Sequence, residues 1–446
     1  MDKRQGQLHV ALSLQNGGYS PGSWRHSQTE RAEWNHPDYY HHLAKTAERG
    51  KFDLLFLDHT GSGEKLRSTG REPGALFEPL TLISSLISVT ERIGIGASVA
   101  IATSEPYAVA RTLAVLDHLS NGRTAWQPEP TEHYEPKRRQ DGETGELSEE
   151  QRFLRTQEFT HVTKSLWNSW QEDALLVDKA SGRFLDANKV QFIHHAGKHF
   201  KVRGPLSVPR PPQGSPVRIE QLQILADPNH VDVTGIDLLF SPQRSLREAS
   251  AFYARLHKRI ADAHRSSNEL KVLTNLSPIL GATEQEAWDK AAAYRELIHP
   301  EAGLAILSDL LGHDVAIYPL DGPLPEIPGI SKAKITGKLR FITELAREEG
   351  LTIRELGRRA AELQGTQVFV GTPAQLVNWM EDWFNSYGSD GFLLQLPDLT
   401  QGLNTFVDDV VPLLQERGLF RTAYSETTLR GNLDLTASST YISARR

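Results

Sequence analysis

Residues 38–57 read DYYHHLAKTAERGKFDLLFL, and this stretch holds the pattern that decides the fold. Apolar side chains recur at the three- and four-residue spacing of one helix face before the stop signal Gly50, which predicts a helix over Asp38–Arg49. The apolar run Leu54–Leu57 follows directly and predicts a buried strand. A strand that follows an amphipathic helix is the repeating unit of a parallel α/β sheet.

The same alternation continues along the chain in both directions. A second helix is predicted over Pro79–Ser88, and a later one begins at Pro373 with Thr372 as its N-cap. Short apolar runs predict eight strands: Leu8–Leu14, Leu54–Leu57, Ile93–Val99, Thr124–Gln127, Val217–Leu222, Asp237–Phe240, Val272–Leu280 and Phe392–Leu396. Strands joined by crossover helices in this number favour an α/β fold, namely a closed (β/α)8 TIM barrel.

Two segments lie outside the minimal barrel pattern. Residues 128–150 are rich in Glu, Pro, Lys and Arg and follow a predicted strand, so we expect an exposed rim loop and a candidate lid. Residues 299–367 lack a strong strand signal, and Pro319–Pro328 predicts an extended connector before two helices. We therefore expect one barrel domain over residues 1–446 that carries this rim loop and this insertion.

Composition and charge narrow the classes of partner. The 49 Lys and Arg residues against 56 Asp and Glu give a net charge of −7, which opposes binding to nucleic acid or to an anionic membrane. The absence of cysteine excludes disulfides, thiolate metal sites and a cysteine nucleophile. No apolar stretch approaches the roughly 20 residues that span a bilayer, and the polar start lacks a signal-peptide core. We expect a cytoplasmic protein.

Longer motifs resemble one known family. They include GYSPGSWRH at residues 18–26, AERGKFD at 47–53, FEPLTL at 77–82, LDHLSNGR at 116–123, VRGPL at 202–206, GTP at 371–373 and VPLLQERG at 411–418. In order and spacing they resemble the luciferase-like flavin monooxygenases, in the branch that contains the nitrilotriacetate, long-chain alkane, pristinamycin and sulfone monooxygenases. The resemblance runs from Leu8 to about Gly418.

The resemblance implies a chemistry as well as a fold. It implies a two-component monooxygenase that receives reduced FMN from a separate flavin reductase, uses dioxygen and oxidises a small organic substrate. It also implies a homodimer and a hairpin insertion between Leu166 and Gln213. Such an enzyme needs a dry pocket at the carboxyl ends of the strands and an anchor for the FMN phosphate.

Several polar residues follow predicted strands, where barrel enzymes place their active sites. Asp58 and His59 follow the second strand, and the family commonly has an Asp at the position of His59, so the acid has moved by one residue. Asp58 is predicted to contact the cofactor and His59 to act in catalysis; the alternative is that the one-residue shift points the side chain elsewhere. Thr103 and Ser104 follow the third strand and could hydrogen-bond to a flavin, or could simply form a turn. His26 is a candidate general acid or substrate-binding group, or a solvated surface histidine.

Two further cofactor candidates stand at positions where the chain departs from the family. Trp126-Gln127 corresponds to a Trp-Asn pair, but Pro128-Glu129-Pro130-Thr131-Glu132-His133 replaces a Val-Val-Thr-Ser type segment. Its two prolines remove N–H donors and its two glutamates add negative charge, and both changes oppose a flavin phosphate or an acidic substrate. Phe153 stands where the family usually has a tyrosine; it could stack on the flavin but cannot donate a hydrogen bond, and packing at a helix start is the alternative.

The predicted phosphate site departs most. Where the family opens a helix with glycine, serine and arginine, residues 221–230 read QLQILADPNH, so the usual anchor is missing. This leaves open a flavin-free barrel that acts as a binding protein, a partner subunit or an enzyme of altered chemistry, and more distantly a deazaflavin-using reductase. No metal is expected, because no carboxylate spacing completes a site around His194, His195 and His199.

Overall fold

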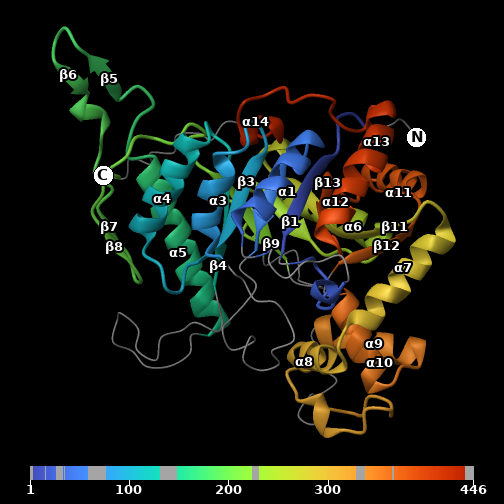
Figure 1. Cartoon of the computed structure of the whole chain (residues 1–446). Coiled ribbons are helices and arrows are strands. Elements are labelled where there is room, and N and C mark those ends of the chain that lie inside the picture. The colour runs from blue at the N-terminus through green and yellow to red at the C-terminus, as the bar shows by residue number, and fades with distance from the viewer. Residues whose placement is uncertain are drawn as a thin grey trace.

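The fold is taken from a computed structural model that describes residues 4–15, 17–26, 34, 36–58, 77–130, 148–222, 231–327, 337–363 and 366–436. Parallel strands close into an eight-stranded barrel in the order β1-β2-β3-β4-β9-β10-β11-β13, because β10 pairs with β11 and β13 pairs back with β1. Helices surround this barrel (Figure 1). The predicted TIM barrel is confirmed.

Each of the eight predicted strands overlaps a strand of the barrel. The barrel strands are β1 His9–Leu14, β2 Leu54–Leu57, β3 Gly94–Ala100, β4 Thr124–Glu129, β9 Val217–Gln221, β10 Leu238–Ser241, β11 Lys271–Leu280 and β13 Gly391–Leu394. A further strand, β12 Gln367–Gly371, was not predicted. It pairs with the second half of β11, which is ten residues long and extends past the region where β11 pairs with β13.

Many of the helices begin at a residue whose side chain caps them, such as Ser148 of α5 and Ser245 of α6. The longer helices are α1 Pro37–Arg49, α3 Pro79–Ile87, α4 Pro106–Leu119, α5 Glu149–Trp167, α6 Leu246–Asp262, α7 Glu284–Leu297, α8 Pro300–Leu311, α9 Gly337–Glu349, α10 Ile353–Leu363 and α11 Pro373–Asn385. The last part of the chain forms α12 Leu399–Thr405, a π-helical turn Phe406–Val410, α13 Val411–Glu416 and α14 Leu429–Asn432. As predicted, Thr372 caps α11, in a capping box with Gln375. Among the described residues no helix is long and apolar enough to cross a bilayer.

The amino-terminal part of the barrel interior is filled by side chains. Phe56 and Phe240 meet edge to face with their ring centroids 5.2 Å apart, and small and branched side chains of the other strands surround them. Leu429, Leu433 and Leu435, from α14 and the residues after it, belong to the same apolar cluster. The α14 segment therefore closes the amino-terminal end of the barrel.

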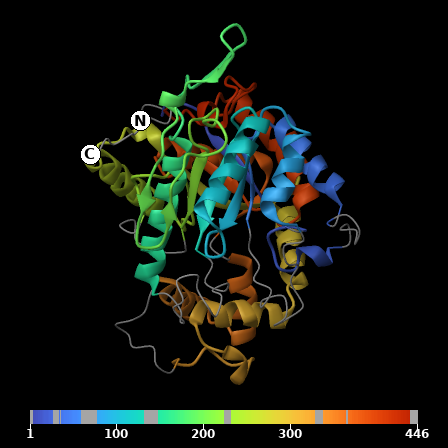
Figure 2. The same ribbon diagram turned by 90° about the vertical axis from the view of Figure 1, so that its left-hand side faces the viewer.

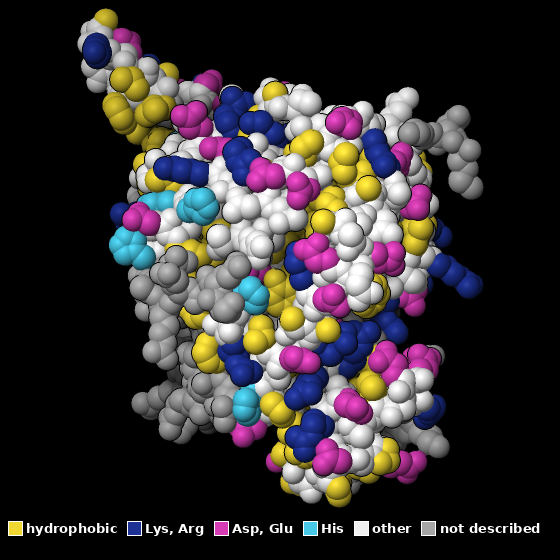
Figure 3. Space-filling model, turned by 45° about the vertical axis from the view of Figure 1, so that its right-hand side comes forward, with side chains coloured by type: hydrophobic (Ala, Val, Ile, Leu, Met, Phe, Trp, Pro, Cys, Tyr) yellow, Lys and Arg dark blue, Asp and Glu magenta, His cyan; other side chains and the backbone are white. Residues whose placement is uncertain are grey.

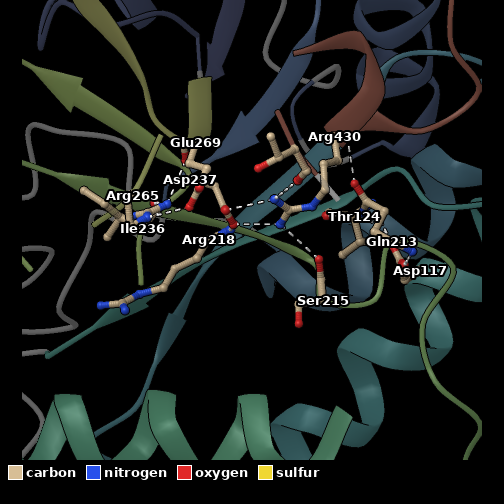
Figure 4. Close-up of polar contacts among 11 residues, drawn as sticks. Asp117, Thr124, Gln213, Ser215, Arg218, Ile236, Asp237, Arg265, Glu269 and Arg430 are labelled. Carbon is tan, nitrogen blue, oxygen red and sulfur yellow. Dashed lines mark hydrogen bonds and ion pairs between the residues drawn. The ribbon is translucent and has the colours of Figure 1, made fainter. Parts of the chain in front are cut away.

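A polar network fastens this closing segment (Figure 4). The guanidinium group of Arg430 donates to both carboxylate oxygens of Asp237, each at 2.9 Å. The backbone N–H of Arg430 donates to Gln213 Oε1 at 2.9 Å, and the Gln213 amide donates to Asp117 Oδ1 at 2.6 Å. Buried charge and amide groups are thus paired, which makes α14 an integral part of the barrel.

The segment predicted as an insertion has an apolar cluster of its own. Leu304, Leu307 and Leu311 on α8 pack against Ile342 on α9 and Leu356 on α10. The part of Pro319–Pro328 that the structure describes contains neither a helix nor a barrel strand, as predicted for a connector before two helices. These helices lie at the end of the barrel opposite to α14 (Figures 1 and 2).

The prediction for residues 128–150 is wrong at both ends. Pro128 and Glu129 do not begin an exposed loop: they continue β4, where they pair with Val99 and Ala100. Pro128 is tolerated because β9 pairs with β4 only at Ala125 and Trp126, so its missing N–H interrupts no pair of this ladder. At the other end Ser148 caps α5; residues 131–147, and with them the proposed lid, lie outside the described residues.

The expected hairpin insertion comprises two short antiparallel ribbons. One joins β5 Leu175–Asp178 to β6 Arg183–Leu185, and the other joins β7 His195–Ala196 to β8 Lys201–Val202. The β5–β6 ribbon projects from the body of the molecule and carries exposed apolar side chains, among them Phe184 (Figures 1 and 3).

Candidate active site

The inward-facing side chains of the barrel change from apolar to polar along the strands. Alternate residues of a strand share one face, so the inward set on β2 runs from Leu54 to Phe56 and then to Asp58. The polar positions that continue the inward faces are Ser13, Asp58, Ser98, Gln127, Glu129, Gln221, Asn275 and Gln395. Parallel strands end together, so these residues form the mouth, where barrel enzymes carry their active sites.

Two carboxyl groups lie in this mouth. Burial raises the pKa of Asp58 to about 6. Burial, together with repulsion from Asp58, raises the pKa of Glu129 to about 7, although a hydrogen bond with Ser98 lowers it in part. No cation of the described residues lowers either pKa. Both groups therefore exchange protons near neutral pH, which is a property of acid–base groups in active sites.

A tyrosine ties the loop after β1 to the end of β13. The Tyr19 hydroxyl hydrogen-bonds with Thr366 and Gln395, and Thr366 in turn donates to the Gln395 side chain. The preceding Gly18 has a φ of +126°, and a Cβ there would lie 2.0 Å from the Pro397 carbonyl oxygen. Only glycine allows this close approach, so the sequence Gly18-Tyr19 fixes the tyrosine beside the mouth.

Some acceptors of the mouth have no donor in the described part of the chain. They are Glu129 Oε2, Gln127 Oε1 and Asn275 Oδ1, each buried. Asn275 is only 3% exposed. A buried acceptor without a donor costs about 1–3 kcal/mol. These oxygens are therefore suited to a ligand that brings its own N–H or O–H groups.

Of the predicted site residues, Asp58 and Gln127 belong to this inward layer. Asp58 continues the inward face of β2, although the acid stands one residue before the position expected from the family. Gln127 lies on β4, two residues before Glu129. His59 lies outside the described residues.

His26 lies at the edge of the mouth and not in the inward layer. Its Nδ1 is 3.6 Å from Asp398 Oδ2, and its ring centroid is 5.6 Å from that of Tyr294. Tyr294 and Asp398 line a small hollow together with Pro397 and Gln401. A catalytic role for His26 stays a prediction.

The remaining candidates lie farther out. The Ser104 hydroxyl donates to the Ala100 carbonyl at 2.7 Å, as in the turn-forming alternative, and Thr103 is exposed. Phe153 lies on α5 and is 44% exposed. None of the three lies in the inward layer, and their cofactor role stays a prediction.

Sequence reasoning missed several residues of the layer, notably Ser98, Glu129 and Asn275. The available signal was the period of two: Ser98, Glu129 and Asn275 continue the inward faces of their strands two residues after Gly96, Gln127 and Leu273. Around His195 the described residues do not gather three potential metal ligands, and His195 Nε2 lies 3.0 Å from Glu158 Oε1.

A closed parallel barrel with a buried polar layer at its carboxyl-terminal mouth is the arrangement of a TIM-barrel enzyme. A family model described as luciferase-like monooxygenase matches residues 17–390. The chain belongs to this family.

Similar proteins cover the chain almost completely. It is 38% identical over 438 residues to N-acetyl-S-(2-succino)cysteine monooxygenase of Bacillus subtilis (strain 168), with 98% of each chain covered. It is 38% identical over 441 residues to nitrilotriacetate monooxygenase component A of Aminobacter aminovorans, with 96% of each covered. The crystal structure of DmoA from Hyphomicrobium sulfonivorans is similar with a TM-score of 0.85 and 28% identity, over 98% of this chain and 95% of that one.

The chemistry of one mouth residue, Gln127, suits the ring edge of a flavin. The pyrimidine edge of the ring carries both N–H donors and carbonyl acceptors. A glutamine amide can accept a hydrogen bond from the first and donate one to the second. Gln127 lies in the mouth with a buried Oε1 that has no donor among the described residues. Residues 223–230, where the usual phosphate anchor is missing from the sequence, lie outside the described residues.

Proposed function

We propose that this chain is the oxygenase component of a two-component monooxygenase that uses reduced FMN and dioxygen to oxidise a small organic substrate. The observation that carries the proposal is the similarity over nearly the whole chain to named monooxygenases, one of which is itself called a component A. The polar mouth of a closed barrel supports it from the structure.

Reduced FMN, when bound, would supply the two electrons for a reaction in which one oxygen atom of dioxygen enters the substrate and the other is reduced to water. The residues of this chain have separate tasks. Gln127 would orient the ring edge, and the apolar floor around Phe56 excludes water. Burial raises the pKa of Tyr19 to about 12, so its hydroxyl stays a neutral donor. Asp58 and Glu129 can hold or release protons.

The proposal includes partners and a setting. Reduced FMN would come from a separate flavin reductase, the chain would form a homodimer, and the protein would be cytoplasmic. The relatives' names range from an N-acetylated succinocysteine to nitrilotriacetate and a dibenzothiophene sulfone, so they select no single substrate class for this chain.

The test is to titrate the purified protein with FMN, oxidised and anaerobically reduced, and to follow flavin fluorescence and calorimetric heat. We expect saturable binding of reduced FMN, and weaker binding in Gln127→Ala. With a flavin reductase and NADH present, a substrate should raise product formation at the expense of hydrogen peroxide. No binding at high micromolar FMN would overturn the proposal.

A flavin-free barrel is the second candidate. Two buried carboxyl groups at the mouth favour it, because their negative charge repels a phosphate and an anionic reduced flavin. In that case the titration would show no flavin binding while the mouth still takes up a small molecule.

A further inference from the structure

We propose that Asp58 and Glu129, with Asn275, form the substrate-recognition group of the mouth, and that the substrate presents an ammonium group to them. This inference rests on the proposed monooxygenase function and names the chemical class of its substrate: small organic amines, and not carboxylates or sulfonates.

The first argument is position. Asp58 ends the inward face of β2, and Glu129 ends that of β4. Only β3 separates these two strands, and its inward residue Ser98 hydrogen-bonds with Glu129. The two carboxyl groups are close enough for Asp58 to perturb the Glu129 carboxyl electrostatically. They form a pair that faces one ligand.

The second argument is charge. Two carboxyl groups this close repel each other, and a buried site strengthens that repulsion. Asp58 is the charged group that acts on the Glu129 carboxyl. Tyr19, from the loop after β1, interacts with Asp58 but is itself neutral. No lysine, arginine or histidine of the described residues offsets the pair. A cation on the ligand would do so.

The third argument is the set of acceptors. Asn275, on the inward face of β11, is more than nine-tenths buried, and its Oδ1 has no donor among the described residues. Glu129 Oε2 is likewise a buried atom with no donor among the described residues. The inward faces of all the barrel strands end at one mouth, so groups from opposite strands border the same space. An ammonium group brings three N–H donors to such a set.

The alternative donor is the flavin ring itself. Its pyrimidine edge carries no positive charge and offers few donors, so a glutamine amide suffices for it, whereas a pair of carboxylates is suited to a cation. The two sources give different results when flavin binding and amine binding are measured separately on the same variants.

The experiment compares ligands of matched shape on the full chain by titration calorimetry: benzylamine with benzoate, and butylamine with butyrate. We expect each amine to bind about tenfold or more tightly than its carboxylate. Glu129→Gln and Asp58→Asn should each remove most of that preference, while FMN binding is kept or becomes tighter, because each variant removes negative charge from the mouth.

The matched control is Glu220→Gln. Glu220 is a buried carboxyl whose pKa is also raised by burial, and it lies on β9 between the inward positions Ile219 and Gln221, so it faces away from the mouth. This variant should keep the full preference for amines.

A measurement on the unchanged chain covers the case in which a variant fails to fold. Benzylamine stays protonated between pH 5.5 and 8, while the carboxyl pair ionises, so its affinity should rise about tenfold across that range. Carboxylates bound as tightly as amines, a pH-independent amine affinity, or an FMN affinity lost together with the amine preference would each overturn the inference. Amine binding without FMN binding would support it and contradict the monooxygenase function instead.

Discussion

Glu129 shows how one ionisable side chain links the stability of the barrel to pH. Its pKa in the folded protein is about 7, against 4.5 for an ordinary glutamate. The folded state therefore binds the proton more tightly than the unfolded chain does, and stability falls as pH rises from about 4.5 through 7. Above this range the folded protein carries the full cost of a buried charge.

We predict that Glu129→Gln stabilises the protein at pH 8, by on the order of 1–3 kcal/mol, because a neutral amide replaces a buried carboxylate. At pH 5.5, where the native carboxyl already holds its proton, the gain should be smaller. Thermal unfolding at the two pH values measures the difference. The exposed Glu416→Gln should show no such pH-dependent gain, and an equal effect of Glu129→Gln at both pH values would contradict the prediction.

At the scale of elements, the insertion is held together by a crossing of two helices. A Cβ at Gly303 on α8 would lie 2.8 Å from the carbonyl carbon of Gly357 on α10, and the reverse distance is 3.0 Å. The two backbones are in contact at this point, which is why neither position has room for a side chain. Leu307 and Leu356, on the same two helices, belong to the apolar cluster of the insertion.

We predict that Gly357→Ala destabilises the insertion by about 1–3 kcal/mol, because α8 and α10 must move apart. Hydrogen exchange should then become faster over residues 300–363 and stay unchanged in β3. Gly402→Ala is the matched control: it lies in α12, where a Cβ would meet only ordinary contacts at 3.5 Å or more, so it should be neutral or slightly stabilising. Unchanged exchange in Gly357→Ala would show that the crossing is not tight.

At the scale of the whole molecule, the barrel depends on a segment more than 400 residues from its first strand. Leu429 and Leu433 fill the amino-terminal end, and Arg430 pairs with Asp237 beside them. The candidate site lies at the other end. We propose that residues 1–446 form one domain because closure of the barrel needs both ends of the chain.

We predict that Leu433→Ala lowers the free energy of unfolding by about 2–4 kcal/mol, through lost burial and the cavity it leaves. Because Leu433 lies at the end of the barrel opposite to the mouth, the dissociation constant for FMN should not change. Denaturant unfolding and flavin titration check the two parts. Leu119→Ala, at a position that is 63% exposed, should have little effect on either.

The sequence predicted most of the architecture and less of the site. Each predicted barrel strand was found, because burial on both faces leaves apolar runs that can be read locally. β12 was missed because it is half-buried and only pairs with the overhanging part of β11. Asp58 was recognised from its place after a strand and Gln127 from the family's Trp-Asn pair, whereas Glu129 was assigned to a loop in a segment rich in Pro and charged residues.

Local periodicity and long family motifs, both properties of the sequence alone, determined that this protein is a luciferase-like TIM barrel. Which polar side chains meet in the mouth was decided only by the tertiary structure. Strand register and closure bring Asp58, Glu129 and Asn275 to one end of the barrel from positions more than 200 residues apart. Such pairing is non-local, and a shift of one residue would turn each of these side chains to the opposite face.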